Sequence, residues 1–311
     1  MALTSSIEQF DLRIHKYIQD ELPDKPNLIE DETLPKPSRF IMDRVPIDCV
    51  AMEFAVAWVM QGLKHRSAAS PLLIMGPNAQ IVTLAATNPR FAEALLAADL
   101  SVPDGISVVI ASRLLGKPIA ERVTGGDLME RLCAEAAKQG LSVFFLGGLP
   151  GAAAAAAASL KSRYPGLRIS GTYCPPHGFE NDAVESAHIR QLIAYAAPDL
   201  LCVAFGAPKQ EIWMHDNCRS LPIGAAIAVG AALDTQAGLR KRAPQWTHDL
   251  GLEWLYRLAR EPRRLWRRYL FGNTRFVLLV IRQWVSGVAR LSAEIETCKR
   301  DFGRPSQSIK G

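Results

Sequence analysis

The sequence predicts a single doubly wound α/β domain with a mostly parallel, Rossmann-like sheet and a basic, amphipathic helical appendage at its C-terminal end. Short apolar runs recur without polar alternation, as in strands that are buried on both faces. Longer stretches with helical patterning separate these runs, which indicates successive β-α-β units. Glycine, proline and polar residues follow several runs, as expected of loops at the carboxyl ends of parallel strands.

The strands and helices follow from this alternation. The predicted strands, rich in β-branched and aliphatic residues, are Leu72–Met75, Leu100–Val102, Ser142–Leu146, Arg168–Thr172, Leu200–Phe205 and Ala226–Val229. The predicted helices are Met52–Lys64, Asn78–Thr87, Arg90–Ala97, Ile106–Leu115, Gly126–Gln139, Pro150–Arg163, Asp182–Ala197 and Lys209–Ser220. The alanine run Ala152–Ala158 suits a helix that starts at Pro150 and packs close to the sheet.

Composition places the chain among ordinary globular proteins. Its 311 residues are 49% hydrophobic and 22% charged, which excludes disorder, collagen and coiled coil as the dominant class. Residues 1–38 are polar and proline-rich, which predicts a weakly ordered leader. We expect the α/β domain over residues 39–240, the basic appendage over 241–295 and a polar tail over 296–311.

Charge is distributed unevenly along the chain. The formal net charge is +5, from 36 basic and 31 acidic residues. Residues 240–290 contain 12 basic and 3 acidic residues, or +9, so the remaining residues carry 24 − 28 = −4. Such asymmetry predicts that the late segment meets an anionic surface or ligand.

The late segment has the pattern of an amphipathic helix. One face carries Arg264, Arg267, Arg268, Arg275 and Arg282, and the opposite face carries Leu265, Trp266, Tyr269, Phe276, Val280 and Trp284. An Arg- and Trp-rich helix suits an anionic membrane interface, although a solvated helix packed on the core would also show a charged stripe. No recognised nucleic-acid motif accompanies the arginines. The apolar run Phe276–Ile281 is far shorter than the roughly 20 residues of a membrane-spanning helix.

Cysteines and the N-terminus bear on the cellular compartment. The six cysteines are scattered and form no C-x-x-C pair, which argues against a zinc or redox motif and favours a reduced, cytosolic compartment. The first residues contain acids and no uninterrupted apolar stretch, unlike a secretory signal.

Three loops that follow predicted strands are candidates for ligand binding. The first loop contains Gly147 and Gly148, whose backbone N–H groups could meet a phosphate at the start of a helix or simply form a tight turn. The second loop offers a cluster of polar groups for a ligand, or a solvated helix start, and consists of Gly206, Pro208, Lys209, Gln210 and Glu211. The third loop ends in Asp234, which suits hydrogen bonds to ligand hydroxyls or a helix cap.

Two further loops carry polar side chains whose roles are open. Asp104, in Pro103-Asp104-Gly105, has the chemistry of an ordinary turn, but near a substrate hydroxyl it could act as a general base. Asn78 suits either a helix cap or a ligand contact.

Together these motifs resemble the WecG/TagA/CpsF family of bacterial glycosyltransferases over about residues 40–270. The pieces that carry the resemblance, in order, are Pro103-Asp104-Gly105, Arg122-Val123-Thr124-Gly125-Gly126-Asp127, Phe145-Leu146-Gly147-Gly148, Phe205-Gly206-Ala207-Pro208-Lys209-Gln210-Glu211, Arg242-Ala243-Pro244-Gln245-Trp246, Gly251-Leu252-Glu253-Trp254-Leu255-Tyr256-Arg257 and Glu261-Pro262-Arg263-Arg264.

The resemblance implies an inverting transfer from a UDP-sugar to a polyprenyl-diphosphate-linked sugar. It implies assembly of exopolysaccharide or another cell-surface polysaccharide by a peripheral enzyme on the cytoplasmic face of the plasma membrane. Asp104 matches the position of the family's aspartate, which implies a role as general base on the acceptor hydroxyl. Asn78, Arg122, Thr124, Asp127 and the loop residues named above match donor or substrate positions. The positions expected to engage the acceptor diphosphate or the membrane are Arg242, Arg257, Arg260, Arg264, Arg267 and Arg268.

One position departs from the family pattern, and one familiar motif is missing. Many members carry Thr where this chain has Gly76, so this chain has no side-chain hydroxyl at that position. The sequence has no Asp-x-Asp, the carboxylate pair that holds a metal on the nucleotide, and arginine can supply charge in its place. We therefore expect no cofactor and no obligatory protein-bound metal.

Two other classes of function remain open from the sequence. A nucleotide-dependent oxidoreductase fits a doubly wound sheet but lacks the G-x-G-x-x-G motif. A non-catalytic protein could use the basic helix to dock on anionic lipid or nucleic acid, although we expect no nucleic-acid partner. Exposed aromatic residues in the appendage would also allow a homo-oligomer.

Overall fold

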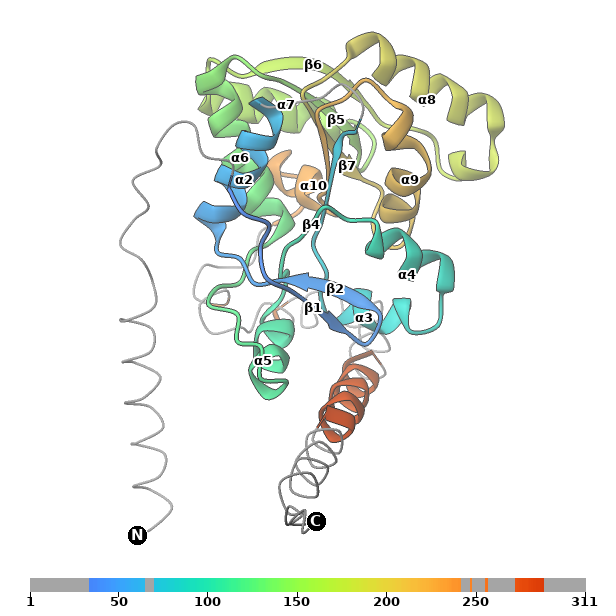
Figure 1. Ribbon diagram of the computed structural model, residues 1–311. Coiled ribbons are helices and arrows are strands. Elements are labelled where there is room, and N and C mark those ends of the chain that lie inside the picture. The colour runs from blue at the N-terminus through green and yellow to red at the C-terminus, as the bar shows by residue number, and fades with distance from the viewer. Residues whose placement is uncertain (1–33, 65–69, 242–246, 248–254, 257–271, 288–311) are drawn as a thin grey trace, which may run out of the picture. The chain divides into compact units, whose positions relative to one another are not determined.

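The computed structural model describes residues 34–64, 70–241, 247, 255–256 and 272–287. The fold belongs to the compact unit that begins at Lys36. A parallel sheet with the strand order β4-β3-β8-β7-β5-β6 forms its centre. Figure 1 shows α2, α6 and α7 on one side of this sheet and α4, α8 and α9 on the other. The doubly wound α/β class predicted from the sequence is confirmed.

The predicted strands and helices occur in the predicted order along the chain, and α10 (Ala232–Gln236) is an additional helix. The parallel strands are β3 (Leu72–Met75), β4 (Leu100–Ser101), β5 (Ser142–Gly147), β6 (Arg168–Tyr173), β7 (Leu200–Ala204) and β8 (Ala225–Ala228). The helices are α2 (Met52–Lys64), α3 (Ala79–Ala85), α4 (Pro89–Leu96), α5 (Ile106–Leu114), α6 (Gly125–Gln139), α7 (Ala152–Arg163), α8 (Ala183–Ala196), α9 (Lys209–Asn217) and α10 (Ala232–Gln236), with a further helix over residues 272–287. Short 3-10 turns are formed by Phe179–Asn181 and Cys218–Ser220.

Some predicted boundaries are wrong for local reasons. Helix α7 begins at Ala152, not at Pro150, because Gly151 precedes it in a left-handed conformation with φ of 80°. Helix α3 begins after Asn78, whose side chain caps it. Strand β7 stops at Ala204, because the chain turns at Gly206, and α9 ends at Asn217, where the 3-10 turn continues.

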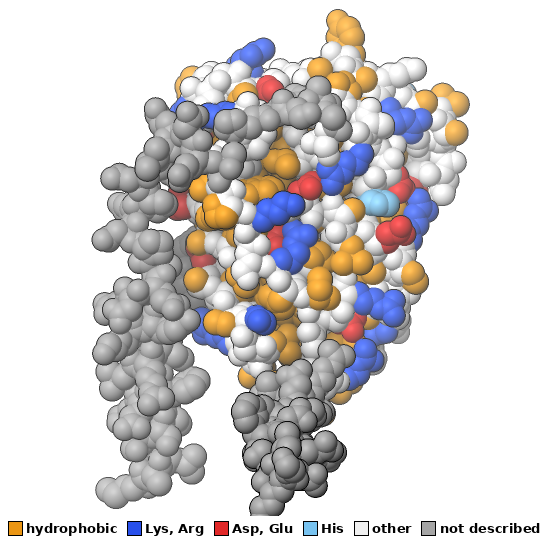
Figure 2. Space-filling view, in the orientation of Figure 1, with side chains coloured by type: hydrophobic (Ala, Val, Ile, Leu, Met, Phe, Trp, Pro, Cys, Tyr) orange, Lys and Arg blue, Asp and Glu red, His pale blue; other side chains and the backbone are white. Residues whose placement is uncertain are grey.

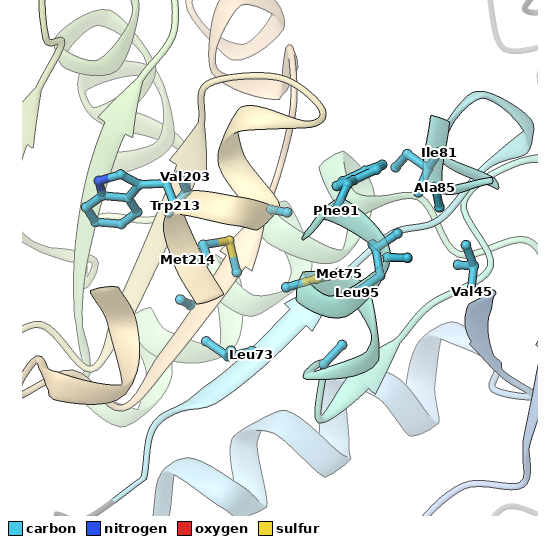
Figure 3. Packing of buried hydrophobic residues seen from close by; sticks show 14 of the residues in the cluster. Val45, Leu73, Met75, Ile81, Ala85, Phe91, Leu95, Val203, Trp213 and Met214 are labelled. Atoms are coloured by element: carbon cyan, nitrogen blue, oxygen red, sulfur yellow. The ribbon is translucent and has the colours of Figure 1, made fainter. Parts of the chain in front are cut away.

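The sheet is buried on both faces by two apolar clusters. Alternate residues of a strand point to opposite faces. In β3, Leu73 and Met75 therefore join the cluster beneath α3, α4, α8 and α9, whereas Ile74 joins the cluster beneath α2, α6 and α7. Figure 3 shows Leu73 and Met75 close to Met214 of α9 and Leu95 of α4. This two-sided burial explains the uninterrupted apolar runs in the sequence.

An antiparallel hairpin, which the sequence does not predict, lies outside the parallel sheet. It consists of β1 (Arg39–Met42) and β2 (Val45–Asp48), with Met42 paired to Val45. Asp43 makes the turn at φ of 57°, which aspartate tolerates better than most residues. The turn residues Asp43-Arg44 and Pro46 inside β2 are not typical hairpin signals, so the sequence pattern does not reveal this hairpin.

The helix over residues 272–287 packs against this hairpin. Its buried residues Phe276 and Val280 join the cluster that also contains Met42 and Val45. The Gln283 side chain donates to the carbonyl oxygen of Ile41, at 2.7 Å, and accepts from the Asp43 N–H, at 2.8 Å. Of the predicted arginine face, Arg275 and Arg282 are exposed, and the residues from 257 to 271 lie outside the described part of the chain. Within the described residues, no helix is long and apolar enough to cross a membrane.

Candidate active site at the carboxyl edge of the sheet

The loops that follow β3 and β4 bring Asp104 and Asn78 together. The Asp104 N–H donates to the carbonyl oxygen of Pro77, at 3.0 Å, and so joins the two loops. A Cβ at Gly76 would lie 3.2 Å from Cβ of Asp104 and 3.4 Å from its Oδ2. The absence of a side chain at position 76 therefore allows this close approach, and a side chain there would press against the carboxylate.

Asn78 has a structural role at this edge. Its Oδ1 accepts from the N–H groups of Gln80 and Ile81, at 3.1 and 3.2 Å, and thereby caps α3. Gly105 follows Asp104 at φ of 148°, and a Cβ there would lie 3.3 Å from Cβ of Asn78. Glycine therefore lets the loop carrying Asp104 lie against the start of α3.

The start of α6 connects this pair of loops to β8. The Val123 N–H donates to the carbonyl oxygen of Pro103, at 3.0 Å. Thr124 caps the helix by accepting from the Asp127 N–H, at 3.1 Å, and its hydroxyl donates to Asp127 Oδ2, at 2.7 Å. Such a cap holds both side chains at the helix start. Gly125 lies so close to β8 that a Cβ there would meet the carbonyl oxygen of Ala228 at 2.9 Å.

The glycine loop after β5 is filled by protein groups. The Gly148 N–H donates to the carbonyl oxygen of Ala204, at 2.9 Å. The Leu149 N–H donates to Asp234 Oδ1, at 2.8 Å, so a carboxylate occupies one donor that a phosphate could have used. Asp234 Oδ2 pairs with Arg240, at 3.2 Å. Asp234 thus connects the loops after β5 and β8, and the predicted hydroxyl contact from Asp234 would have to compete with these partners.

The loop after β7 places the Gln210 side chain between two glycine turns. Its Oε1 accepts from the N–H groups of Gly206 and Gly230, both at 3.1 Å. Its Nε2 donates to Glu211 Oε1, at 2.8 Å. Gly206 and Gly230 have φ of 75° and 54°, and a Cβ on either would have no atom of the described residues within 4 Å. These turns therefore face room in which a ligand could lie.

The two charged residues next to Gln210 differ in environment. Lys209 is half-exposed and pairs with Glu180, and this contact lowers the pKa of Glu180. Glu211 is fully buried, and burial raises its pKa from the ordinary 4.5 to about 7. Its Oε2 has no hydrogen-bond partner among the described residues, which is costly for a buried carboxyl.

The structure gathers the predicted donor-side residues at one edge of the sheet. Asp104, Asn78 and the start of α6 form one group around β3 and β4, and the loops after β5, β7 and β8 form a second group. Gly125, at the start of α6, lies against the end of β8 and so joins the two groups. No set of three or more His, Cys, Asp or Glu side chains suited to a metal occurs in the described part of the chain. The acceptor-side arginines Arg242, Arg257, Arg260, Arg264, Arg267 and Arg268 lie outside the described residues.

Residues 41–290 of the chain match the glycosyl transferase WecG/TagA/CpsF family. The chain belongs to this family of glycosyltransferases. It is 37% identical over 197 residues, covering 63% of this chain and 74% of the relative, to an N-acetylglucosaminyldiphosphoundecaprenol N-acetyl-beta-D-mannosaminyltransferase of Bacillus spizizenii. A protein of the same name from Bacillus subtilis is 32% identical over 206 residues, covering 66% of this chain and 77% of the relative.

Two residues of this candidate site, Glu180 and Arg240, are not singled out by sequence reasoning, and for Gly230 the sequence indicates close backbone approach without naming the partner. Glu180 pairs with Lys209, Gly230 donates to Gln210, and Arg240 pairs with Asp234. Each contact joins residues from different loops, so no local motif marks it.

Proposed function

We propose that this glycosyltransferase moves a hexose, N-acetylhexosamine or uronic acid from a UDP-sugar to a polyprenyl-diphosphate-linked sugar, with inversion at the anomeric carbon. The observation that carries the proposal is the placement of Asp104 at the carboxyl edge, packed against Gly76 and the start of α3. A carboxylate at this edge is suited to take the proton of an acceptor hydroxyl. The names of the two Bacillus relatives support an acceptor of the lipid-diphosphate class.

The proposed step needs one base and stabilisation of a leaving diphosphate. The acceptor oxygen forms a bond to the anomeric carbon of the donor while its proton passes to Asp104. The bond between that carbon and UDP breaks, and its electron pair leaves with UDP. Cationic side chains would offset the charge on the diphosphate, a role for which arginine is well shaped. No obligatory protein-bound metal is included in this proposal.

The helix over residues 272–287 supports the proposal that this enzyme acts at an anionic membrane surface. Its exposed apolar residues are Val277, Leu278, Ile281, Trp284 and Val285, each 49–61% exposed. Arg275 and Arg282 are exposed on the same helix. Apolar and cationic side chains together are typical of helices that lie in the interface of a bilayer. We propose peripheral association with the cytoplasmic face of the plasma membrane, in synthesis of a cell-surface polysaccharide such as an exopolysaccharide.

A UDP-release assay tests the proposal. Purified full chain is incubated with the UDP derivatives of N-acetylmannosamine, N-acetylmannosaminuronic acid, glucose and glucuronic acid, each with a short-chain lipid-diphosphate N-acetylglucosamine acceptor. We expect release with one donor that requires the acceptor. Asp104→Asn should lower kcat by about 10²–10⁴-fold, because the amide cannot take the proton. Unimpaired turnover by this variant would exclude Asp104 as the base, and no release with any donor would contradict the proposed reaction.

A further inference from the structure

The buried pair Gln210 and Glu211 connects two loops of the sheet. Strands β7 and β8 are neighbours, and their regular pairing ends near Val203 and Ala228. Beyond that point the chain leaves β7 for α9, in the apolar cluster of Trp213 and Met214. It leaves β8 for α10, whose Leu233 belongs to the cluster on the other face of the sheet. The two loops therefore diverge, and open sheets bind ligands where loops diverge in this way.

The Gln210 amide bridges these diverging loops. Its oxygen accepts from Gly206, after β7, and from Gly230, after β8, at 3.1 Å each. Both lone-pair directions of the oxygen are thus used by backbone donors. An amide that rotated by 180° about its last torsion would present N–H groups to these same donors and lose both contacts. The bridge works only while the amide holds one of its two orientations.

Glu211 adds a side-chain contact that favours this orientation together with the two backbone donors. Its Oε1 accepts from Gln210 Nε2, at 2.8 Å, and can accept only if the nitrogen points toward it. Glu211 is 0% exposed and Gln210 is 5% exposed, so water does not compete freely with this contact. The other oxygen of Glu211 has no partner among the described residues, so within them the contact to Gln210 is the one side-chain hydrogen bond that this carboxyl accepts.

We propose that Glu211 is a positioning residue that locks the Gln210 amide, and through it sets the separation of the Gly206 and Gly230 turns that border the donor. This inference rests on the proposed function for the identity of the ligand, and on the hydrogen bonds alone for the lock. Glu211 does not touch the reacting atoms in this proposal. The burial that raises its pKa to about 7 is compatible with the role, because Oε1 can accept from Gln210 in both protonation states.

Two substitutions of Glu211 separate positioning from charge. Glu211→Gln keeps a side-chain oxygen that can accept from Gln210, whereas Glu211→Leu removes the acceptor at similar volume. We expect Glu211→Gln to keep kcat/KM for the UDP-sugar within about threefold of the wild type. Glu211→Leu should raise the donor KM by about tenfold or more with a smaller change in kcat, because misplaced turns bind the donor poorly. The matched control is Glu185→Gln, which alters a carboxylate on α8 that accepts from the Tyr173 hydroxyl on β6. This control should leave both kinetic constants unchanged.

Hydrogen exchange supplies a readout that does not depend on the reaction. The Gly206 and Gly230 amides should exchange slowly in the wild type and in Glu211→Gln, and at least about tenfold faster in Glu211→Leu. Equal protection of both amides in a folded Glu211→Leu would overturn the lock. Equal loss of activity in Glu211→Gln and Glu211→Leu would show that the charge itself acts in the reaction, and would overturn positioning. If the proposed reaction is wrong but the lock exists, the Gly206 and Gly230 amides will be protected in a wild-type chain that releases no UDP.

Discussion

At the scale of single residues, burial of Glu211 makes the stability of the fold depend on pH. Its pKa is raised by burial from 4.5 to about 7 in the folded chain, so the folded state binds this proton more tightly than the unfolded state. The stabilising contribution is therefore complete below about pH 4.5, and it is lost as pH rises through about 7. The difference corresponds to up to about 3 kcal/mol.

Glu211→Gln should remove this dependence. The amide is uncharged at every pH and keeps the shape of the side chain. We expect the variant to be more stable than the wild type at pH 8, by up to about 3 kcal/mol, and nearly equal to it at pH 5. Urea unfolding at the two pH values measures this difference. A variant that is equally or less stable at pH 8 would show that the carboxylate is solvated or paired in the folded chain.

The residues of the site were only partly predictable from the sequence. Asp104 and Asn78 stand out because polar side chains follow buried strands, and the structure brings their loops together. The partners of these loops, such as Glu180 for Lys209 and Arg240 for Asp234, come from distant segments. Such contacts depend on how loops pack, which no local spacing encodes.

At the scale of elements, the packing of α6 on β8 depends on Gly125. A Cβ at this position would lie 2.9 Å from the carbonyl oxygen of Ala228, and backbone atoms cannot move aside cheaply. We expect Gly125→Ala to destabilise the fold by about 1–3 kcal/mol, because helix and strand must separate. The free energy of unfolding from urea titration measures the effect.

A matched glycine substitution controls for the gain in helix propensity. Gly272 begins the helix over residues 272–287, and a Cβ there would have no atom of the described residues within 4 Å. Gly272→Ala should therefore change stability by no more than about 0.5 kcal/mol. If Gly125→Ala were equally neutral, α6 would have to be able to shift away from β8 without loss of packing.

At the scale of the whole molecule, the basic charge is concentrated in one late segment of the chain. Figure 2 shows Lys and Arg side chains interspersed with Asp and Glu over the visible described face. Residues 240–290 carry a formal net charge of +9, and the rest of the sequence carries −4. The exposed apolar residues of the helix over residues 272–287 lie in the basic segment, which favours this part for the membrane contact that we propose.

Removing apolar side chains from this helix should weaken membrane binding. Ile281 and Trp284 are 49% and 51% exposed, and Ile281→Ser with Trp284→Ser should reduce flotation with phosphatidylglycerol vesicles by at least about tenfold. The control is Val184→Ser with Tyr195→Ser on α8, whose side chains are 81% and 95% exposed. We expect the control to float as the wild type does. An equal loss in both variants would indicate that general surface hydrophobicity, and not this helix, drives binding.

By itself the sequence determined the α/β class, the succession of most strands and helices along the chain, and the loops that carry polar residues. These features follow from local patterns, because a strand buried on both faces needs an uninterrupted apolar run and a helix needs its own periodicity. Only the tertiary structure decided that Asp234 fills the glycine loop, that Gln210 bridges two turns, and that the hairpin of β1 and β2 supports the helix over residues 272–287. Those contacts join segments that are far apart in the chain, so their existence depends on packing geometry that local sequence patterns do not contain.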